Sequence, residues 1–258
     1  MSEAVSRAVV NPVVRAAPWD PEKLLLQEAR PQACLLIISE SDVCRSVLAA
    51  ECLRAALAAV GLEGDVVVET CGTRPYNLGE GPESAVPEAL EALGLDPPGH
   101  HSARLFEPAA DIVAYDLLLV MDKYTASDVM REVSSFDLIN RQSQFSHKVR
   151  RLGEFVGGPL QDREYGSEGD ELDIEDPLYG NVGGEEEQKA VLRAGRAIRV
   201  ACRSLASYLA QLKEEGVEAS GPTGGAVALG PMLRSKVQLM SPTPWLVPPM
   251  LSARPSDQ

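Results

Sequence analysis

Basic side chains are scarce in this 258-residue sequence. It holds 24 lysines and arginines against 38 aspartates and glutamates, which gives a formal net charge of −14. Nucleic acids are bound by clustered Lys and Arg, so this balance argues against a nucleic-acid partner. Long apolar runs are missing as well: the run from Cys34 to Ile38 is far shorter than the ~18 residues that a membrane-spanning helix needs. We therefore expect neither nucleic-acid binding nor a membrane span.

Cysteine patterns that build disulfide frameworks or zinc sites are also absent. The five cysteines are an odd number without CxxC spacing, so we predict no structural disulfides, no metal and no cofactor. Reduced thiols fit the cytoplasm or an organelle stroma or matrix. The N-terminus leaves the compartment open, because residues 4–19 hold Arg7 and Arg15 but no acid. This pattern is found both in residual organelle-targeting sequences and in disordered polar leaders.

Strand and helix patterns alternate along the middle of the chain, and 45% apolar residues are enough for a buried core. Short β-branched or aliphatic runs predict strands at 34–39, 65–71, 115–121 and, as a short fourth one, 172–175. Helical spacing of apolar residues predicts helices at 45–60, 83–93, 125–133 and 185–213. Such alternation is typical of an α/β fold with a mainly parallel sheet.

Two flanking segments differ from this body. We interpret residues 1–33 as an N-terminal extension, 34–215 as the folded domain and 216–258 as a C-terminal extension, which holds seven prolines and five glycines. The apolar and proline residues of this last segment suit an extended peptide that docks on a protein partner, although plain disorder fits them equally.

Acidic residues are concentrated in one part of the domain. The stretch 162–187 contains eleven acids and one arginine, and it overlaps a predicted insertion near 157–170. It is either a solvated loop or a second contact surface for a protein partner.

The segment between the first strand and the first helix is the candidate ligand site. Parallel α/β sheets bind ligands at the carboxyl ends of their strands, and a helix N-terminus attracts phosphate. The loop from Ile38 to Ser46 lies at this place, and Arg45 can offer its planar guanidinium to two phosphate oxygens. The same arginine could instead hold the loop itself together.

Five motifs in order resemble those of the low-molecular-weight protein tyrosine phosphatase family. They comprise the loop at 38–46, the segment at 70–80, the pair at 101–104 and 116–122, the segment at 151–155 and the one at 175–180. The resemblance covers roughly residues 34–214. It implies a three-layer α/β sandwich with a central, mainly parallel four-stranded sheet and a phosphate loop after the first strand.

The resemblance also implies roles for individual residues. Arg45 stands where the family has its phosphate clamp, Ser46 where it has a hydroxyl that supports the nucleophile, and Asp176 where it has its general acid. Tyr76 and Tyr179 correspond to the aromatic residues at the substrate mouth. The rest of the implied phosphate loop consists of Glu40, Ser41, Asp42, Val43 and Cys44.

The attacking residue itself departs from the family pattern, since Ser39 stands where the family has its nucleophilic cysteine. A thiol with a pKa of ~8.5 can be ionised at a helix N-terminus, whereas an alcohol starts far higher and needs an adjacent base. The three histidines, His100, His101 and His147, fall in segments whose family equivalents lie away from the loop. A solvated carboxylate such as Glu40 or Asp42 is a poor base for an alcohol.

Three neighbouring substitutions act in the same direction. Glu40 and Asp42 replace uncharged residues and would repel a phosphate dianion, or pair with Arg45 in its place. Ser41 replaces a glycine and would strain the loop if its backbone needs positive φ. Asp176 precedes Pro177 and is also explained by a structural turn.

We therefore expect a phosphatase-like protein without catalysis that serves as a structural or protein-binding subunit. An active tyrosine or aryl phosphatase that uses Ser39, and a phosphotyrosine binder that does not hydrolyse its ligand, are the alternatives.

Overall fold

A four-stranded parallel sheet forms the centre of the molecule. The computed structural model describes residues 31–139, 145–156, 173–181, 183–220 and 227–239. The sheet has the order β2-β1-β3-β4 and is made of β1 (Ala33–Ser39), β2 (Val66–Gly72), β3 (Leu117–Val120) and β4 (Val149–Arg151). All neighbouring strands pair in parallel, and the register places Ser39 beside Gly72 at the carboxyl end of the β1–β2 pair. The predicted α/β fold is confirmed.

Alternation along β1 divides the core between the two faces of this sheet. Leu35 and Ile37 belong to one apolar cluster, whereas Leu36 and Ile38 belong to the other. Because successive strand residues point to opposite faces, a strand buried on both sides reads as an unbroken apolar run. This run explains why β1 was recognisable in the sequence.

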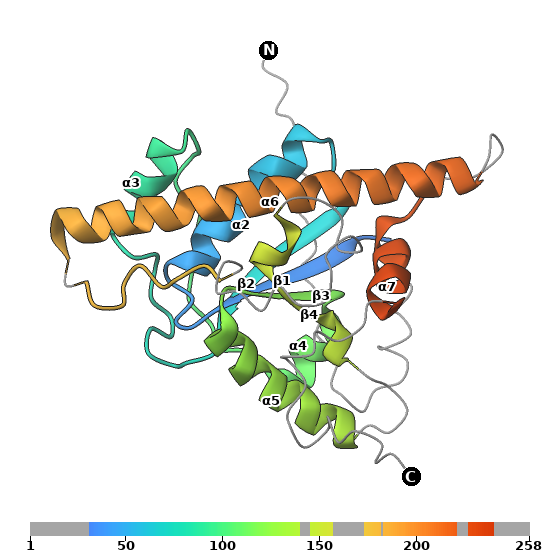
Figure 1. Ribbon diagram of the computed structural model, residues 1–258, viewed down its shortest axis with the longest axis horizontal. Coiled ribbons are helices and arrows are strands. Elements are labelled where there is room, and N and C mark those ends of the chain that lie inside the picture. The colour runs from blue at the N-terminus through green and yellow to red at the C-terminus, as the bar shows by residue number, and fades with distance from the viewer. Residues whose placement is uncertain (1–30, 140–144, 157–172, 182, 221–226, 240–258) are drawn as a thin grey trace, which may run out of the picture.

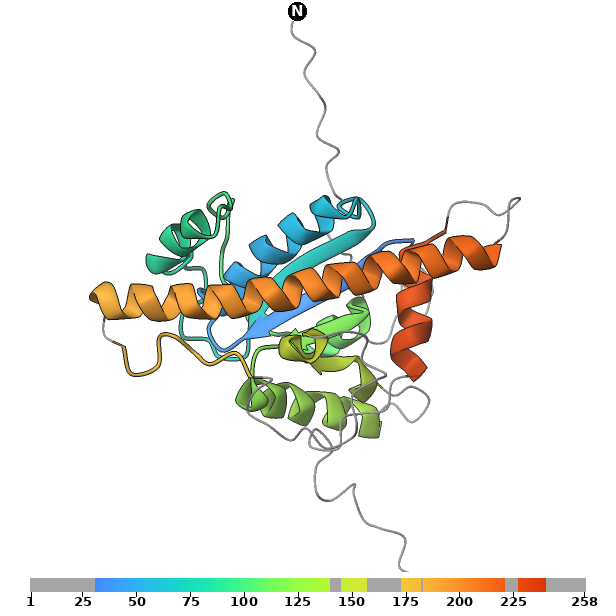
Figure 2. The ribbon, with the colours of Figure 1, turned by 45° about the horizontal axis from the view of Figure 1, so that its top comes forward.

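Helices cover both faces and complete three layers (Figures 1 and 2). One face carries α2 (Arg45–Ala59), α3 (Ala85–Ala92) and the long α6 (Gly184–Ser220). The other face carries α4 (Pro108–Ala114) and α5 (Lys123–Ile139). Two short 3₁₀ turns, η1 (Ser146–Lys148) and η2 (Leu152–Phe155), flank β4.

The fourth strand is the main correction to the predicted elements. It lies at β4 and not at 172–175, of which the described residues 173–175 form no strand. Strand β4 consists of Val149, Arg150 and Arg151, so it contains no apolar run by which it could be recognised in the sequence. The predicted helix positions hold, but α4 was missed, and α5 and α6 end several residues later than their apolar periodicity indicated.

One further helix, α7 (Leu229–Leu239), lies within the predicted C-terminal extension and packs on the domain. Leu229, Leu233 and Val237 are buried in the same apolar cluster as α2 and α6. At the amino end of β1, the Gly230 N–H donates to the Pro31 carbonyl at 2.8 Å. Figure 1 shows α7 below the carboxyl end of α6.

The remaining segments of the predicted extensions, and all of the acidic insertion near 157–170, lie outside the described residues. Within the helices that are described, none combines the length and the apolar character required to cross a bilayer.

Candidate functional site

The loop between β1 and α2 lies at the point of the sheet where the order of the strands reverses. From β1 the chain passes to β2 on one side and later to β3 on the other, so the crevice for a ligand opens at the carboxyl end of β1. The loop is fixed by backbone hydrogen bonds from the Thr73 N–H to the Ser39 carbonyl (3.0 Å) and from the Arg74 N–H to the Glu40 carbonyl (2.8 Å). A Cβ on Gly72 would lie 2.9 Å from the Glu40 carbonyl oxygen, so this close approach requires glycine.

Asp42 has the unusual backbone conformation that lets the loop turn. Its φ is 58°, the left-handed conformation that aspartate tolerates better than most residues. The strain expected at Ser41 is thus absent, because the left-handed position is one residue later and is filled by a suitable side chain. Asp42 is 1% exposed and points beneath the loop, which corrects its expected place at the border of the anion site.

The Asp42 carboxylate is surrounded by hydrogen-bond donors. Its Oδ1 accepts from the Ser46 hydroxyl at 2.9 Å and its Oδ2 from the Arg104 N–H at 3.1 Å. Burial raises the pKa of the Asp42 carboxyl, although hydrogen bonds from Arg104, Ser46 and Thr70 and the charge of His101 act in the opposite direction. The buried carboxyl therefore binds a proton more tightly than a solvated one.

His101 is closer to the loop than expected. Its Nε2 lies 2.6 Å from the Asp42 carbonyl oxygen, to which it donates, and 3.9 Å from the Asp42 carboxylate. The prediction that all three histidines lie away from the loop was wrong for this residue. No local pattern could have revealed this contact, because it joins residues 59 positions apart.

Ser39 lies at the bottom of the loop and is 3% exposed. Its hydroxyl donates to the Ser46 hydroxyl at 2.9 Å and accepts from the Asp42 N–H at 3.2 Å. The structure thus brings the two predicted hydroxyls, Ser39 and Ser46, into direct contact.

Arg45 is held by acids other than the two considered from the sequence. Its Nη1 donates to Asp122 and, at 2.7 Å, to the Ile174 carbonyl, while its Nη2 donates to Asp176 at 2.7 Å. The alternative pair with Glu40 or Asp42 was wrong, because the guanidinium bonds Asp122 and Asp176 instead. Asp42 faces beneath the loop, and Glu40 is exposed at the cavity. Although burial alone would raise it, the pKa of Asp122 is lowered by Arg45 and by the Thr125 N–H.

The two carboxylates on Arg45 differ in accessibility. The side chain of Asp122 is 10% exposed and that of Asp176 is 23% exposed. The second oxygen of Asp176 accepts from the Leu178 N–H at 3.0 Å, within the turn that Pro177 begins. Asp176 is therefore the more easily displaced of the two partners.

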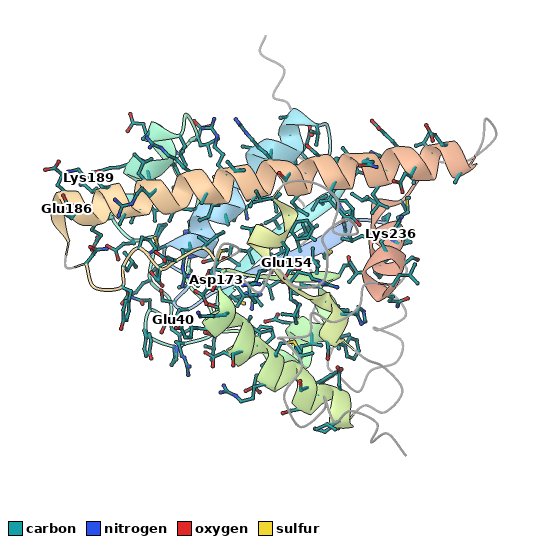
Figure 3. All side chains as sticks on the ribbon, in the orientation of Figure 1. Glu40, Glu154, Asp173, Glu186, Lys189 and Lys236 are labelled. Carbon is teal, nitrogen blue, oxygen red and sulfur yellow. The ribbon has the colours of Figure 1, made fainter. Side chains whose placement is uncertain are left out.

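An open cavity of about 800 Å³ lies in front of Arg45. Six carboxylates and three cationic side chains line it, together with two tyrosines and two threonines: Glu40, Arg45, Thr73, Arg74, Asp122, Lys123, Tyr124, Thr125, Asp128, Asp173, Glu175, Asp176 and Tyr179. Glu40 and Asp173 are labelled in Figure 3 and lie on the same side of the molecule. A lining with this excess of acids opposes the entry of an anion.

The predicted mouth residues are only partly brought together. Tyr179 is 90% exposed and lines the cavity, whereas Tyr76 is 68% exposed and is not among the residues that line it. Tyr124 and Asp122 were not assigned from the sequence. Both follow the end of β3, and the rule that ligands bind at strand carboxyl ends could have identified them.

Of the remaining loop residues, Glu40 is exposed, Ser41 is half-buried and the other two are buried. Val43 and Cys44 are each 3% exposed, and burial raises the pKa of the Cys44 thiol to about 12. Across the described part of the chain, no group of three or more His, Cys, Asp or Glu side chains is placed to hold a metal ion.

Comparisons with known proteins agree with this fold. The family model for low molecular weight phosphotyrosine protein phosphatase matches residues 34–218. A Synechocystis sp. protein named as a low molecular weight protein-tyrosine-phosphatase is 30% identical over 152 residues, which cover 59% of this chain and 84% of that protein.

Two solved structures show the same fold at lower identity. A protein tyrosine phosphatase from Entamoeba histolytica superposes with a TM-score of 0.52 at 18% identity, covering 70% of this chain and 98% of its own. A variant of the YwlE arginine phosphatase of Bacillus subtilis superposes with a TM-score of 0.50 at 19% identity, covering 68% and 95% of the two chains.

Proposed function

Because the chain belongs to the low molecular weight phosphotyrosine protein phosphatase family, we propose that it is a member that does not turn over phosphate esters and that acts as a structural or protein-binding subunit. The observation that carries this proposal is the hydroxyl of Ser39 at the position of the attacking thiol. A phosphoserine formed there would have to expel an alkoxide, a much poorer leaving group than a thiolate.

The state of Arg45 supports the same proposal. In this structure its guanidinium is satisfied by two carboxylates and one carbonyl, so an incoming phosphate must displace Asp176. The displaced carboxylate would remain in a cavity that already holds five further acids. At a protein surface, two like unit charges 4 Å apart repel by about 4 kcal/mol.

The protein-binding part of the proposal rests on the extensions. The end of α7 exposes Leu239, and the proline-rich residues 240–258 follow it directly. A pull-down with the full chain and with a chain ending at residue 239 tests this role, because the shorter chain keeps α7 and its core contacts. Capture of the same proteins by both chains would contradict a role for the tail.

Turnover is tested with the full chain and p-nitrophenyl phosphate. We expect no continuous release of nitrophenol from the wild type, and weak or no heat on titration with phosphotyrosine. Continuous release that Ser39→Ala abolishes would overturn the proposal in favour of an enzyme. Tight phosphotyrosine binding without release would overturn it in favour of a binder.

Restoration provides the matched control. The quadruple change Ser39→Cys, Glu40→Leu, Ser41→Gly and Asp42→Asn returns the loop to the family's residue types. Recovered hydrolysis by this variant would show that the rest of the site is intact and that the loop alone accounts for the inactivity.

One observation favours the second candidate, an active phosphatase that uses Ser39. The Ser39 hydroxyl is hydrogen-bonded to Ser46, which is bonded in turn to a buried carboxylate. In the YwlE structure, the cysteine has been replaced by serine and the active-site serine is phosphorylated. Serine at this position in the fold therefore accepts phosphate in that protein.

A further inference from the structure

An apolar surface lies where α5 and α7 end, and we call it the α5/α7 surface. Leu138 and Ile139 at the end of α5 are 67% and 68% exposed, and Leu239 at the end of α7 is 83% exposed. These are the three most exposed large aliphatic side chains among the described residues. Figures 1 and 2 show both helices ending on the same side of the molecule, and η1 contacts both. Apolar side chains that gather in one place, unlike scattered ones, indicate a contact surface.

Two phenylalanines adjoin this surface and are held in place. The rings of Phe136 on α5 and Phe145 before η1 are half-buried and meet edge to face, with their centroids 5.5 Å apart. The carboxylate of Asp137 accepts from the Phe145 N–H at 2.8 Å and from the Ser146 hydroxyl at 2.6 Å, which ties this segment to the end of α5. Burial lowers the pKa of His147 on η1 to about 4, so this imidazole adds no charge at neutral pH. The surface is therefore preformed and apolar.

The chain itself supplies a segment that matches this surface. Residues 240–258 follow Leu239 directly, and residues 240–253 contain no charged side chain. Six large apolar residues and four prolines make up most of this stretch: Met240, Pro242, Pro244, Trp245, Leu246, Val247, Pro248, Pro249, Met250 and Leu251. Large apolar side chains gain free energy by leaving water. Prolines restrict the backbone to extended conformations, so less conformational entropy is lost when such a segment docks.

The point of attachment favours this segment over a separate molecule. An extended proline-rich chain rises about 3.1 Å per residue, so residues 240–245 span up to roughly 19 Å. Because the segment starts at Leu239, its effective concentration at the α5/α7 surface is of the order of millimolar. A free protein would need a comparable concentration or a much higher affinity to occupy the same surface.

We propose that residues 240–251 dock on the α5/α7 surface of their own chain, with the Trp245 side chain against Leu138 and Ile139. This docking needs no partner, so it goes beyond the proposed function. It also affects that function, since a protein that binds the tail must first displace it from the domain. The apparent affinity for such a protein is reduced by the fraction of chains whose tail is docked.

The experiment measures contact between Trp245 and α5 in the full chain. Trp19→Phe leaves Trp245 as the one tryptophan. Ser135→Cys, one helical turn before Ile139, provides an exposed thiol for a nitroxide label, and the five native cysteines are buried. A nitroxide quenches tryptophan fluorescence on contact, so we expect labelling to remove most of the Trp245 emission and denaturant to restore it. Unchanged emission in the native protein would overturn the proposal.

A matched control uses the same chemistry elsewhere. Ser84→Cys places the label at an exposed position before α3, on the other face of the sheet. We expect this label to leave the Trp245 emission unchanged. Equal quenching from both positions would show that the tail does not occupy a defined place, and would refute the docking.

Changes to the surface test the same contact without a label. In the Trp19→Phe background, Leu138→Ser combined with Ile139→Ser should shift the Trp245 emission maximum to longer wavelength, toward that of the denatured chain. Val200→Ser combined with Val217→Ser removes two exposed apolar side chains from α6 and should cause no shift. An emission maximum that is the same with and without Leu138 and Ile139 would rule out this surface.

Protein concentration identifies the occupant. Quenching within one chain is independent of concentration, whereas docking of the tail on a second copy weakens on dilution and would contradict the proposal. These measurements contain no partner and no phosphate ester. A failure of the proposed function, seen as continuous nitrophenol release or as capture of the same proteins without the tail, is therefore distinguishable from a failure of docking.

Discussion

At the scale of single residues, Asp42 combines a left-handed backbone conformation with a carboxyl group that is almost completely buried. The backbone conformation and the hydrogen bonds shape the loop, while the buried charge opposes folding. A single side chain thus stabilises the geometry of the site at a cost in stability that depends on pH.

The sign of this cost follows from the raised pKa. The folded protein binds the Asp42 proton more tightly than the unfolded chain does, so the contribution of Asp42 to stability falls as pH rises from the unfolded pKa toward the folded one. We expect the melting temperature of Asp42→Asn, relative to that of the wild type, to increase from pH 4 to pH 8, by about 2–4 °C for each kcal/mol. Thermal scans across this range, with the exposed Asp96→Asn as control, would contradict the argument if the difference stayed constant.

We expect Asp176 to limit the affinity of Arg45 for anions, because it occupies part of the guanidinium. Asp176→Asn removes the more exposed of the two carboxylates from the guanidinium. We expect inorganic phosphate to bind this variant at least about tenfold more tightly than the wild type, a change of roughly 1.4 kcal/mol. Calorimetry provides the measurement, and Glu175→Gln, which removes the same charge from the same cavity without a contact to Arg45, should have a smaller effect. Equal effects would show that only the total charge matters.

Part of this site could be predicted from the sequence, and part could not. The loop and Arg45 could be located because a strand followed at once by a helix places a fixed segment at a known edge of the sheet. The direction of the Asp42 side chain could not, since it depends on Ser46, Arg104 and His101, which only the folded chain brings together.

At the scale of elements, α7 adds a packed helix to the domain that the sequence predicted. It begins beside β1 and inserts three apolar side chains against α6 and β1. On α6, a Cβ at Gly216 would lie 2.7 Å from the Val227 side chain, so glycine permits the close approach of the segment that leads into α7.

Leu233 tests how much α7 contributes to stability. It is buried in the main apolar cluster, so Leu233→Ala should lower the free energy of unfolding by about 2–5 kcal/mol. Gln238→Ala on the exposed face of the same helix should change it by less than about 0.5 kcal/mol. Urea unfolding measures both, and a Leu233→Ala cost as small as that of Gln238→Ala would mean that α7 is not part of the cooperative unit.

The elements themselves were largely predictable, with reasons for the exceptions. The apolar runs of β1, β2 and β3 are long enough to identify a strand buried on both faces, whereas β4 has three residues and two of them are arginines. Helix α7 was missed although Leu229, Leu233 and Val237 recur every four residues, because the glycines and prolines in and around it indicate an irregular segment.

At the scale of the whole molecule, the thiols are uniformly shielded. All five cysteines are buried. Burial raises the pKa of Cys44 to about 12 and that of Cys52 to about 11, and raises the pKa of Cys202 as well.

A thiol-reactive aromatic disulfide should therefore react with no cysteine of the native protein within minutes at pH 8, and with all five in denaturant. The rate in the native protein should follow the rate of unfolding as urea is added. One rapidly reacting thiol, assigned by peptide mapping, would contradict the described burial.

Strand β1 also separates two ends of the domain. The hydrogen bond between Pro31 and Gly230 lies at its amino end and Ser39 at its carboxyl end, roughly 25 Å apart at about 3.3 Å per residue. A second protein tethered through the residues that precede Pro31 would join the domain at the end remote from the cavity. Such a partner leaves the entrance sterically free, so a ternary assembly with a small phosphorylated ligand is geometrically permitted.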